Sequence, residues 1–249
     1  MTTRDTTVAV FRPDDERLTN AVELIESLGA TPVPDPMLSV RPSGSGPQTG
    51  ADYTILTSKT GAELAREAGW EPGETTVCAI GPSTAQALRD QGYEVDRIPG
   101  EYTSSGLVSE LAGDVDGATV EVARSDHGSD VLIDGLWQAG AFVHETVLYE
   151  LVRPEGAGES VELAAAGDLD AAAFTSSLTV ENFLATADEK GIREEALAGL
   201  NDAVVGVIGP PTRETAESLG IAVDVVPDNA DFEELACVVV EEAAPTYHD

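Results

Sequence analysis

The chain has 249 residues, 42% of them hydrophobic, which is enough to build one large domain or two of ordinary size. Its 13 lysines and arginines stand against 46 aspartates and glutamates, giving a net charge of -33 at pH 7. So little positive charge disfavours a nucleic-acid partner, because no basic patch is available to displace counterions from phosphates. The acids are spread between regularly spaced apolar residues, which indicates a folded, halophilic protein with an acidic surface rather than a disordered chain.

The rare residue types indicate neither a metal site nor a disulfide framework. His127, His144 and His248 are too scattered to form a cluster of metal ligands. Cys78 and Cys237 each lie in an apolar run, so both are expected to be small buried core residues. No apolar run approaches the ~18 residues of a membrane span, and no signal-peptide core follows the first residues. We therefore expect no metal, no membrane contact and a cytoplasmic location.

Apolar spacing and turn residues predict an alternation of strands and helices in the first part of the chain. The predicted elements are a strand at 7–11, a helix closed by Gly29, a strand at 31–33, an irregular link at 41–50, a strand at 53–56, a helix ended by Gly69, a strand at 76–80, a Gly-Pro turn with a helix to Gly92, and a strand at 95–98. A helix through Leu111 follows, with Ser104 or Ser105 as its cap.

The same alternation continues to the end of the chain. The predicted elements are a strand at 119–123, a helix through Trp137, a strand at 142–147, an unassigned segment at 155–167, a strand at 170–174, a helix with Val180 and Phe183, a short helix near 192–199, a strand at 203–208, a second Gly-Pro turn with a helix to Gly220, a strand at 222–226 and a last helix with Leu235 and Val239. Trp70 and Trp137 are expected to be packing residues. This alternation predicts an α/β fold with parallel sheets covered by helices on both faces.

Internal repeats divide these elements into two similar sets. The segment Ile80-Gly81-Pro82-Ser83-Thr84 returns as Ile208-Gly209-Pro210-Pro211-Thr212, and Thr57-Ser58 aligns with Thr175-Ser176. A further unit, Val8 to Arg12, aligns with Val120 to Arg124, but it comes first in one set and last in the other. The consistent solution is one domain inserted in another, with domain A at 1–37 and 152–249, domain B at 38–151, and a two-stranded hinge between them.

Ligands of open parallel sheets bind at the carboxyl ends of the strands, where helix N-termini offer free backbone N–H groups. The strand-end residues expected to face each other across a cleft are Arg12, Thr57, Ser58, Thr84, Arg124, Ser176, Ser177 and Thr212, and the helix that begins near Ser104 and Ser105 offers further donors. Each position also has a structural interpretation. The serines and threonines can be helix caps, and the two arginines can pair with the abundant acids.

The order and spacing of these motifs resemble the uroporphyrinogen-III synthase family over nearly the whole chain. The resemblance rests on the strand before Arg12, the Thr-Ser pairs, the two Ile-Gly-Pro-x-Thr units, the segment Tyr102 to Leu107 and Val147-Leu148-Tyr149. It implies two flavodoxin-like domains joined by a hinge, with no metal or organic cofactor. The implied substrate is hydroxymethylbilane, a linear tetrapyrrole, which is cyclised with inversion of its terminal ring D through a spiro intermediate.

The resemblance also implies roles for individual residues. Tyr149 matches the tyrosine that is the favoured candidate to help the substrate's terminal hydroxyl leave, although it could be an ordinary strand tyrosine. Ser58, Thr84, Ser176 and Thr212 match residues that line the family's cleft. Pro211 is a departure, because relatives often carry another hydroxyl residue there.

Two other functions are compatible with the sequence. A non-catalytic two-domain protein could bind an anionic small molecule without changing it, and a degenerate paralogue could keep the fold without activity. Duplicated domains supply their own cleft, so a monomer is sufficient, with transient contact to the upstream enzyme that forms the bilane.

Overall fold

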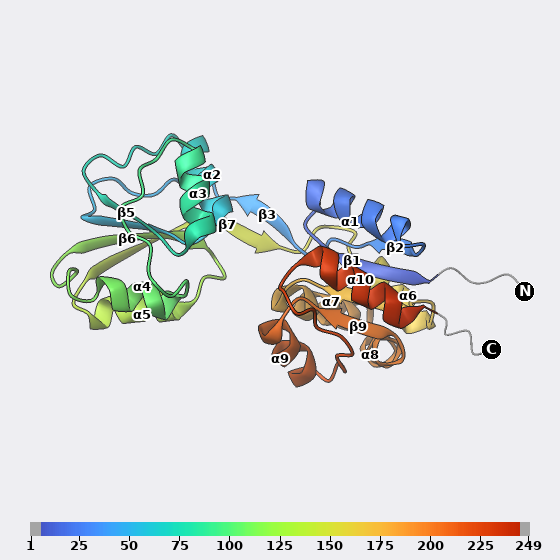
Figure 1. Ribbon diagram of the computed structural model, residues 1–249. Coiled ribbons are helices and arrows are strands. Elements are labelled where there is room, and N and C mark those ends of the chain that lie inside the picture. The colour runs from blue at the N-terminus through green and yellow to red at the C-terminus, as the bar shows by residue number, and fades with distance from the viewer. Residues whose placement is uncertain (1–5, 245–249) are drawn as a thin grey trace, which may run out of the picture. The chain divides into compact units, whose positions relative to one another are not determined.

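The computed structural model describes residues 6–244, so the predictions for the first residues and for His248 lie outside the described part. The chain divides into two compact units. Unit 1 is formed by the segment up to Ser39 and the segment from Val152 onward, and unit 2 by Val40–Leu151. The predicted α/β fold with parallel sheets and helices is confirmed (Figure 1).

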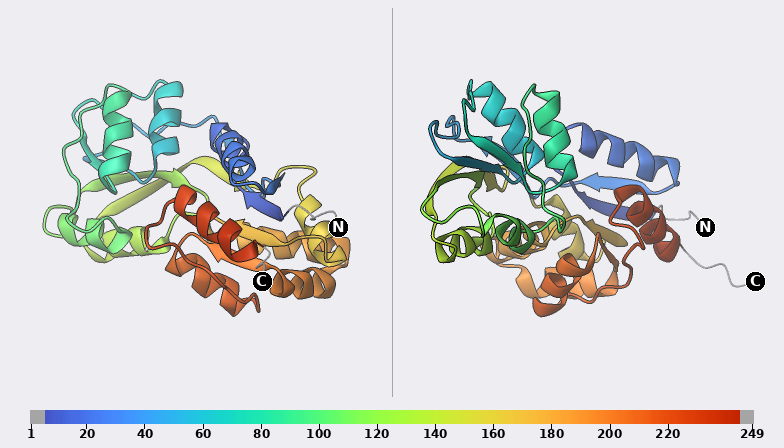
Figure 2. Two further views of the ribbon diagram at one scale, coloured as in Figure 1. Left: turned by 45° about the vertical axis from the view of Figure 1, so that its right-hand side comes forward. Right: turned by 60° about the vertical axis from the view of Figure 1, so that its left-hand side comes forward.

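Unit 1 is built on a parallel sheet with strand order β2-β1-β8-β9. Its elements are β1 (Thr7–Phe11), α1 (Glu16–Ser27), β2 (Thr31–Pro34), α6 (Glu159–Ala166), β8 (Ala171–Phe174), α7 (Ser177–Lys190), α8 (Arg193–Asp202), β9 (Val204–Val207), α9 (Pro210–Ser218) and α10 (Phe232–Ala243). The segment at 155–167, unassigned from sequence, contains α6. Helices cover both faces of this sheet (Figure 2).

Strand alternation explains why the sheet of unit 1 is covered on both sides. Ala9 and Phe11 of β1 point to one face, where α6, α7, α8 and α9 supply the core. Val8 and Val10 point to the other face, where they pack against α1 and α10. The ring of Phe11 stacks on that of Phe174, with centroids 4.3 Å apart. A strand buried on both faces has to be apolar, as β1 is from Val8 to Phe11.

Unit 2 is built on a sheet with strand order β3-β7-β6-β4-β5, in which β7, β6, β4 and β5 are parallel. Its elements are β3 (Ser39–Pro42), β4 (Tyr53–Leu56), α2 (Lys59–Glu67), β5 (Thr76–Ala79), α3 (Pro82–Asp90), α4 (Ser104–Leu111), β6 (Thr119–Ser125), α5 (Asp130–Gln138) and β7 (Phe142–Val152). Leu56 and Ala123 pack with α2 and α3 on one face, and Ile55 and Val122 with α4 and α5 on the other.

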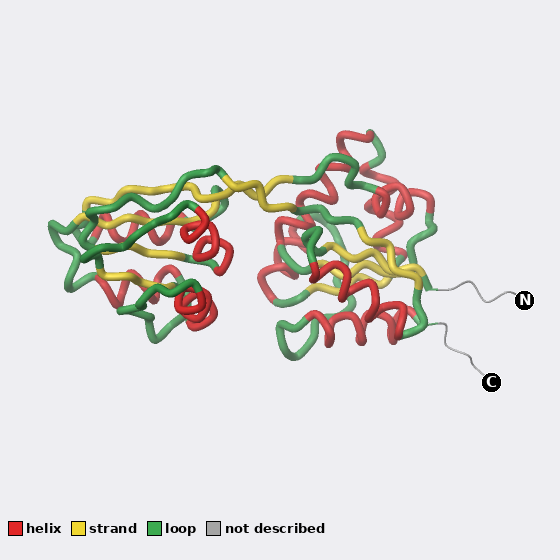
Figure 3. The backbone as a smooth tube through the Cα atoms, turned by 90° about the horizontal axis from the view of Figure 1, so that it is seen from above, coloured by secondary structure: helices red, strands yellow, loops and turns green. Residues whose placement is uncertain are grey.

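The two covalent connections between the units are extended strands, β3 and the end of β7 (Figure 3). Sequence analysis placed residues 41 and 42 in an irregular link, which is wrong. The N–H of Ser43 donates to the carbonyl of Leu148 at 2.9 Å, and Arg41 pairs with Glu150. The residue numbers of these pairs increase along β3 while they decrease along β7, so the two strands are antiparallel. Only this long-range pairing, invisible in the local sequence, makes the segment a strand.

The strands predicted at 95–98 and 222–226 are each reduced to a single bridge. Cys78 bridges to Arg97, and Gly206 bridges to Val225. Aspartate side chains replace some of the backbone hydrogen bonds that a full strand would make. In unit 2 the carboxylate of Asp96 accepts the N–H of Val77 at 2.8 Å. In unit 1 the carboxylate of Asp224 accepts the N–H of Val205 at the same distance. The side-chain acceptor satisfies a strand N–H that a longer edge strand would otherwise have paired.

Two side chains expected in the core lie at the surface. Cys237 is exposed on α10, because Leu235, Ala236 and Val239 occupy the face that packs on the sheet. Trp137 is 57% exposed at the end of α5, whereas Trp70 is buried as expected. Between residues 6 and 244 no helix is both long and apolar enough to cross a membrane.

We predict that the native chain has one reactive thiol. Burial raises the pKa of the Cys78 thiol to about 12, so the thiol stays protonated at pH 8 and does not act as a nucleophile. Cys237 is exposed, so we expect its thiol to react. Mass spectrometry after brief alkylation of native protein should find a single adduct on Cys237 and none in Cys237→Ser, whereas the unfolded chain should take two. Rapid labelling of Cys78 in the native protein would contradict the buried position.

Candidate functional site

The strand registers place the predicted site residues at the carboxyl edge of each sheet. In unit 1, Phe11 pairs with Phe174, so Arg12 and Thr175 follow neighbouring strand ends. In unit 2, Ala123 pairs with Leu56, so Arg124 and Thr57 occupy the equivalent places. The residues that sequence alignment matched between the repeats therefore take matching positions in the two sheets.

Tyr149 and Ser58, predicted from separate parts of the sequence, are in direct contact in unit 2. The Tyr149 hydroxyl donates a hydrogen bond of 3.0 Å to Ser58 Oγ. Ser58 is the N-cap of α2, and its Oγ also accepts the backbone N–H of Gly61 at 2.9 Å. Tyr149 is only 6% exposed and packs with Leu148 and the α2–α3 side of the core. The phenol is thus held in one orientation at the start of α2.

This arrangement leaves one hydroxyl proton uncommitted. Ser58 Oγ accepts two hydrogen bonds, from Tyr149 and from Gly61, and its own proton has no acceptor among the described residues. A hydroxyl has one donor and two acceptor positions, so both acceptor positions of Ser58 are filled. The Ser58 hydroxyl can therefore donate its proton to a ligand while it accepts the hydrogen bond from Tyr149.

Arg124 is held by its own unit. The residue is 5% exposed, and its Nε and Nη1 atoms donate hydrogen bonds of 2.6 Å to Glu145 Oε1 and to the carbonyl of Ser129. A Cβ at Gly128 would lie 2.3 Å from Arg124 Cδ, so only glycine fits beneath the guanidinium. This geometry favours the ion-pairing interpretation of Arg124, in which it fixes the loop between β6 and α5.

Arg12, the equivalent arginine of unit 1, has a different environment. Its guanidinium carbon lies 4.8 Å from the ring centroid of Phe232, and its buried Nε has no hydrogen-bond partner among the described residues. Burial lowers the pKa of Arg12, as does the neighbouring charge of Arg17, while Asp15 and Asp231 act in the opposite direction. An arginine stays protonated in either case, so unit 1 presents a cation with an unused donor.

The two Gly-Pro units begin helices that have no side-chain cap. Gly81 and Gly209 are the N-caps of α3 and α9, so the interpretation of Thr84 and Thr212 as caps is wrong. Each threonine lies in the first turn and is 3% exposed, and neither side chain hydrogen-bonds to a described residue. Because proline lacks an N–H, the two prolines that open α9 leave it fewer free backbone donors than α3.

Other predicted residues act at helix starts. Ser176 caps α7 by accepting the N–H of Thr179, and Thr57 is half-buried at the end of β4. Thr175, which we did not select, donates to the carbonyl of Phe11 at 2.8 Å and ties the ends of β8 and β1 together. Its alignment with Thr57 in the repeat was the signal that could have identified it.

The predicted cap of α4, Ser104 or Ser105, is one or two residues too late. Thr103, rather than Ser104 or Ser105, accepts the N–H of Gly106 at 3.0 Å. Thr103 has the extended backbone that an N-cap needs, whereas the two serines are already helical. Tyr102, exposed just before this cap, packs against Gly81, so the starts of α4 and α3 are neighbours in unit 2.

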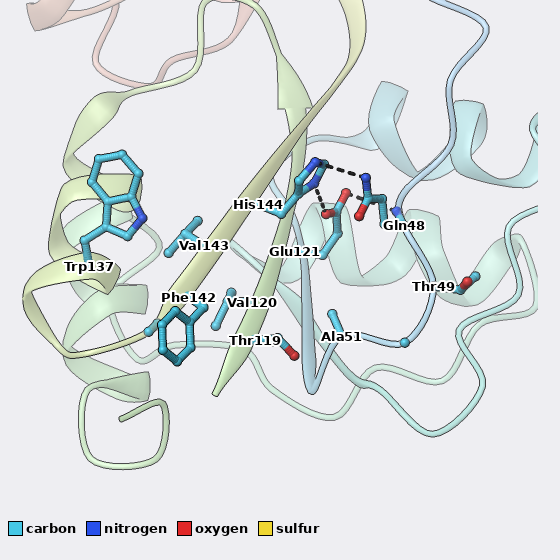
Figure 4. A pocket seen from close by; sticks show the side chains of 12 residues that line it. Gln48, Thr49, Ala51, Thr119, Val120, Glu121, Trp137, Phe142, Val143 and His144 are labelled. Atoms are coloured by element: carbon cyan, nitrogen blue, oxygen red, sulfur yellow. Dashed lines mark hydrogen bonds and ion pairs between the residues drawn. The ribbon is translucent and has the colours of Figure 1, made fainter. Parts of the chain in front are cut away.

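A pocket of about 550 Å³ lies in unit 2 near the amino ends of β6 and β7, away from the strand ends described above. None of the predicted site residues lines it. Figure 4 shows the His144 ring between the Glu121 carboxylate and the Gln48 amide, with contacts of 2.7 and 3.0 Å. Glu121 is buried and also accepts the backbone N–H of Gln48, so these groups fasten the 48–51 loop onto the sheet. Among residues 6–244 no cluster of side chains suited to a metal ion is found.

Comparison with known proteins identifies the family. The family model described as uroporphyrinogen-III synthase HemD matches residues 20–237. The chain belongs to the uroporphyrinogen-III synthase family. A relative from Methanothermobacter thermautotrophicus is 35% identical over 230 residues, covering 86% of this chain and 90% of the relative. The uroporphyrinogen-III synthase of Synechococcus elongatus is 29% identical over 177 residues, covering 68% of this chain and 66% of that protein.

Solved structures of the family share the fold. A mutant uroporphyrinogen III synthase from the extremely thermophilic bacterium Thermus thermophilus aligns with a TM-score of 0.67 over 96% of this chain and 98% of its own, at 20% identity. Uroporphyrinogen-III synthetase from Helicobacter pylori 26695 aligns with a TM-score of 0.60 over 97% and 100%, at 14% identity. Members of this family are lyases that cyclise hydroxymethylbilane in tetrapyrrole synthesis.

Proposed function

We propose that this chain converts hydroxymethylbilane into uroporphyrinogen III with release of one water, inverting ring D through a spiro intermediate. The observation that carries the proposal is the hydrogen bond from Tyr149 to Ser58, which orients a proton donor at the start of α2 in a member of this family. Loss of the terminal hydroxyl is the step that needs a proton, because hydroxide is a poor leaving group.

Tyr149 and Ser58 act as a relay. Ser58 donates its free proton to the departing hydroxyl of the bilane, and Tyr149 replaces that proton through the hydrogen bond it already makes, which leaves a phenolate. The proton that ring D loses at ring closure returns to this phenolate and restores the pair. The leaving oxygen departs as water, and the resulting azafulvenium cation is attacked by the substituted carbon of ring D. Everything after this step is controlled by how the two ends of the bilane are held, so the remaining contribution of the protein is positioning.

The carboxylates of the bilane meet local donors despite the net charge of -33. Arg12 offers the positive charge of its guanidinium in unit 1. The start of α3 and the capped starts of α2 and α7 add backbone N–H groups, each helix end contributing about 0.3 to 1 kcal/mol. The hydroxyls of Thr84 and Thr212 offer a further, directional bond each. We assign substrate contact to these groups and to Thr57 and Ser176.

The architecture we propose for this function is two flavodoxin-like domains, 1–37 with 152–249 and 38–151, joined through β3 and β7. We further propose that the chain works as a cytoplasmic monomer without a metal or organic cofactor. The alternative is a binding protein that closes on an anionic small molecule and leaves it unchanged.

The product isomer tests the proposed function. Purified protein in molar salt, incubated with freshly generated hydroxymethylbilane, should give a dominant type III uroporphyrin after oxidation and chromatographic separation. A parallel sample without protein closes spontaneously to type I and sets the background. Only type I at the background rate would exclude the synthase and favour the binding protein.

Tyr149→Phe should lower kcat on the order of a hundredfold, as expected for loss of a positioned proton donor. The melting temperature should change little, because the ring keeps its packing and one neutral hydrogen bond is lost. Tyr93→Phe is the matched control, since its hydroxyl also makes one buried hydrogen bond, to the Trp70 carbonyl, but lies away from Ser58. Full activity in Tyr149→Phe would remove this residue from the mechanism.

Salt should stabilise the chain. Its acidic side chains repel one another, and added ions screen that repulsion over a Debye length of about 3 Å at 1 M against about 10 Å at 0.1 M. We therefore expect the melting temperature to rise steadily between 0.1 and 2 M KCl. Calorimetry at several salt concentrations checks this, and a melting temperature indifferent to salt would show that the acidic surface is not a halophilic feature.

A further inference from the structure

A chain of hydroxyls joins the starts of α7 and α9 in unit 1. Thr215 Oγ1 donates to Ser177 Oγ at 2.8 Å, and Ser177 Oγ donates to the carbonyl of Pro211 at 3.2 Å. Thr215 Oγ1 also lies 3.0 Å from the same carbonyl. Ser177 opens α7 immediately after its cap, and Pro211 lies in the first turn of α9, so the contact spans two helix starts.

The internal repeat shows that this contact is specific to unit 1. By the alignment of the Thr-Ser pairs, the counterpart of Ser177 is Lys59, and by the alignment of the Gly-Pro units the counterpart of Thr215 is Ala87. An alanine has no hydroxyl, so the same bridge cannot form between α2 and α3. Unit 2 instead uses the Tyr149–Ser58 hydrogen bond at its corresponding helix start. The bridge is therefore no general requirement of the fold.

We infer that Thr215 and Ser177 are positioning residues that fix the first turn of α9, and with it Thr212, for substrate binding in unit 1. Thr212 lies one residue after Pro211, is almost fully buried, and makes no side-chain hydrogen bond to the described residues. A small rotation of this turn would redirect the Thr212 hydroxyl. Ser177 was predicted to touch the ligand, but its hydroxyl is already engaged by Thr215 and Pro211.

The bridge also bears on the proline at position 211, which is itself compatible with the first turn of a helix. A side-chain hydroxyl at this position is missing, and the two prolines offer no backbone N–H. The Pro211 carbonyl remains, and Ser177 binds it from the neighbouring helix. The first turn of α9 is thereby held by a hydrogen bond that its carbonyl accepts, and not by one that its own N–H groups donate.

The test compares Thr215→Val, which removes the hydroxyl at nearly constant volume, with Thr215→Ser, which keeps it. Ser218→Ala is the matched control. This substitution also removes a side-chain hydrogen bond on α9, but that bond, from Ser218 to the Thr215 carbonyl, lies within the helix. Two quantities are measured for each variant. They are hydrogen exchange at the amides of Arg213 and Glu214, and the KM and kcat for hydroxymethylbilane.

For Thr215→Val we expect exchange at these amides to accelerate about threefold to tenfold, the range for loss of one neutral hydrogen bond, and KM to rise by a similar factor with a smaller change in kcat. Thr215→Ser should restore both, and Ser218→Ala should alter neither. Unchanged exchange in Thr215→Val, or equal effects in Ser218→Ala, would overturn the inference.

The KM part of the inference rests on the proposed function, whereas the exchange measurement does not. If wild-type protein yields only type I product, the proposed function fails, and exchange alone still decides whether the bridge fixes the turn. If Thr215→Val accelerates exchange in an active enzyme but leaves KM constant, the bridge holds the first turn of α9 without contributing to substrate binding. That result would overturn the positioning role.

Discussion

Parallel pairing between strands that are distant in sequence is the constraint on which the candidate site depends. Thr7 at the start of β1 is fixed beside Asp170, the residue before β8, although 163 residues separate them. Because the strands run the same way, their carboxyl ends and the helix starts that follow lie at one edge of each sheet. Apolar residues on both faces hold the register, and the polar residues at that edge are free to differ between the units.

The two units use the same scaffold for different chemistry. Arg124 is neutralised by Glu145 and fixes a loop, whereas its counterpart Arg12 has an unused donor above Phe232. Ser58 accepts a hydrogen bond from the Tyr149 hydroxyl, whereas Ser176 caps its helix without a tyrosine partner. A duplicated fold has thus become asymmetric, with an oriented proton donor in unit 2 and a cation in unit 1.

Sequence patterns predicted the elements whose information is local. Apolar strands, glycine-terminated helices and the caps Ser58 and Ser176 follow from spacing and propensity. Features set by distant partners were missed. The strand β3 depends on β7, the bridge of Ser177 depends on α9, and Thr84 and Thr212 look like caps until the backbone shows glycine in that role. Whether an arginine is paired or free, as for Arg124 and Arg12, depends on neighbours that no local pattern specifies.

The relay from Tyr149 through Ser58 is the central claim, and a double-mutant cycle on kcat tests it most directly. Tyr149→Phe, Ser58→Ala and their combination are compared, with Ser176→Ala as a second partner that removes an equivalent cap lacking a tyrosine. If Ser58 and Tyr149 act in series, the double variant is no slower than the slower single variant, while the effects of Tyr149→Phe and Ser176→Ala multiply. Multiplying effects for Tyr149→Phe and Ser58→Ala would show that the two hydroxyls act independently and would contradict the relay.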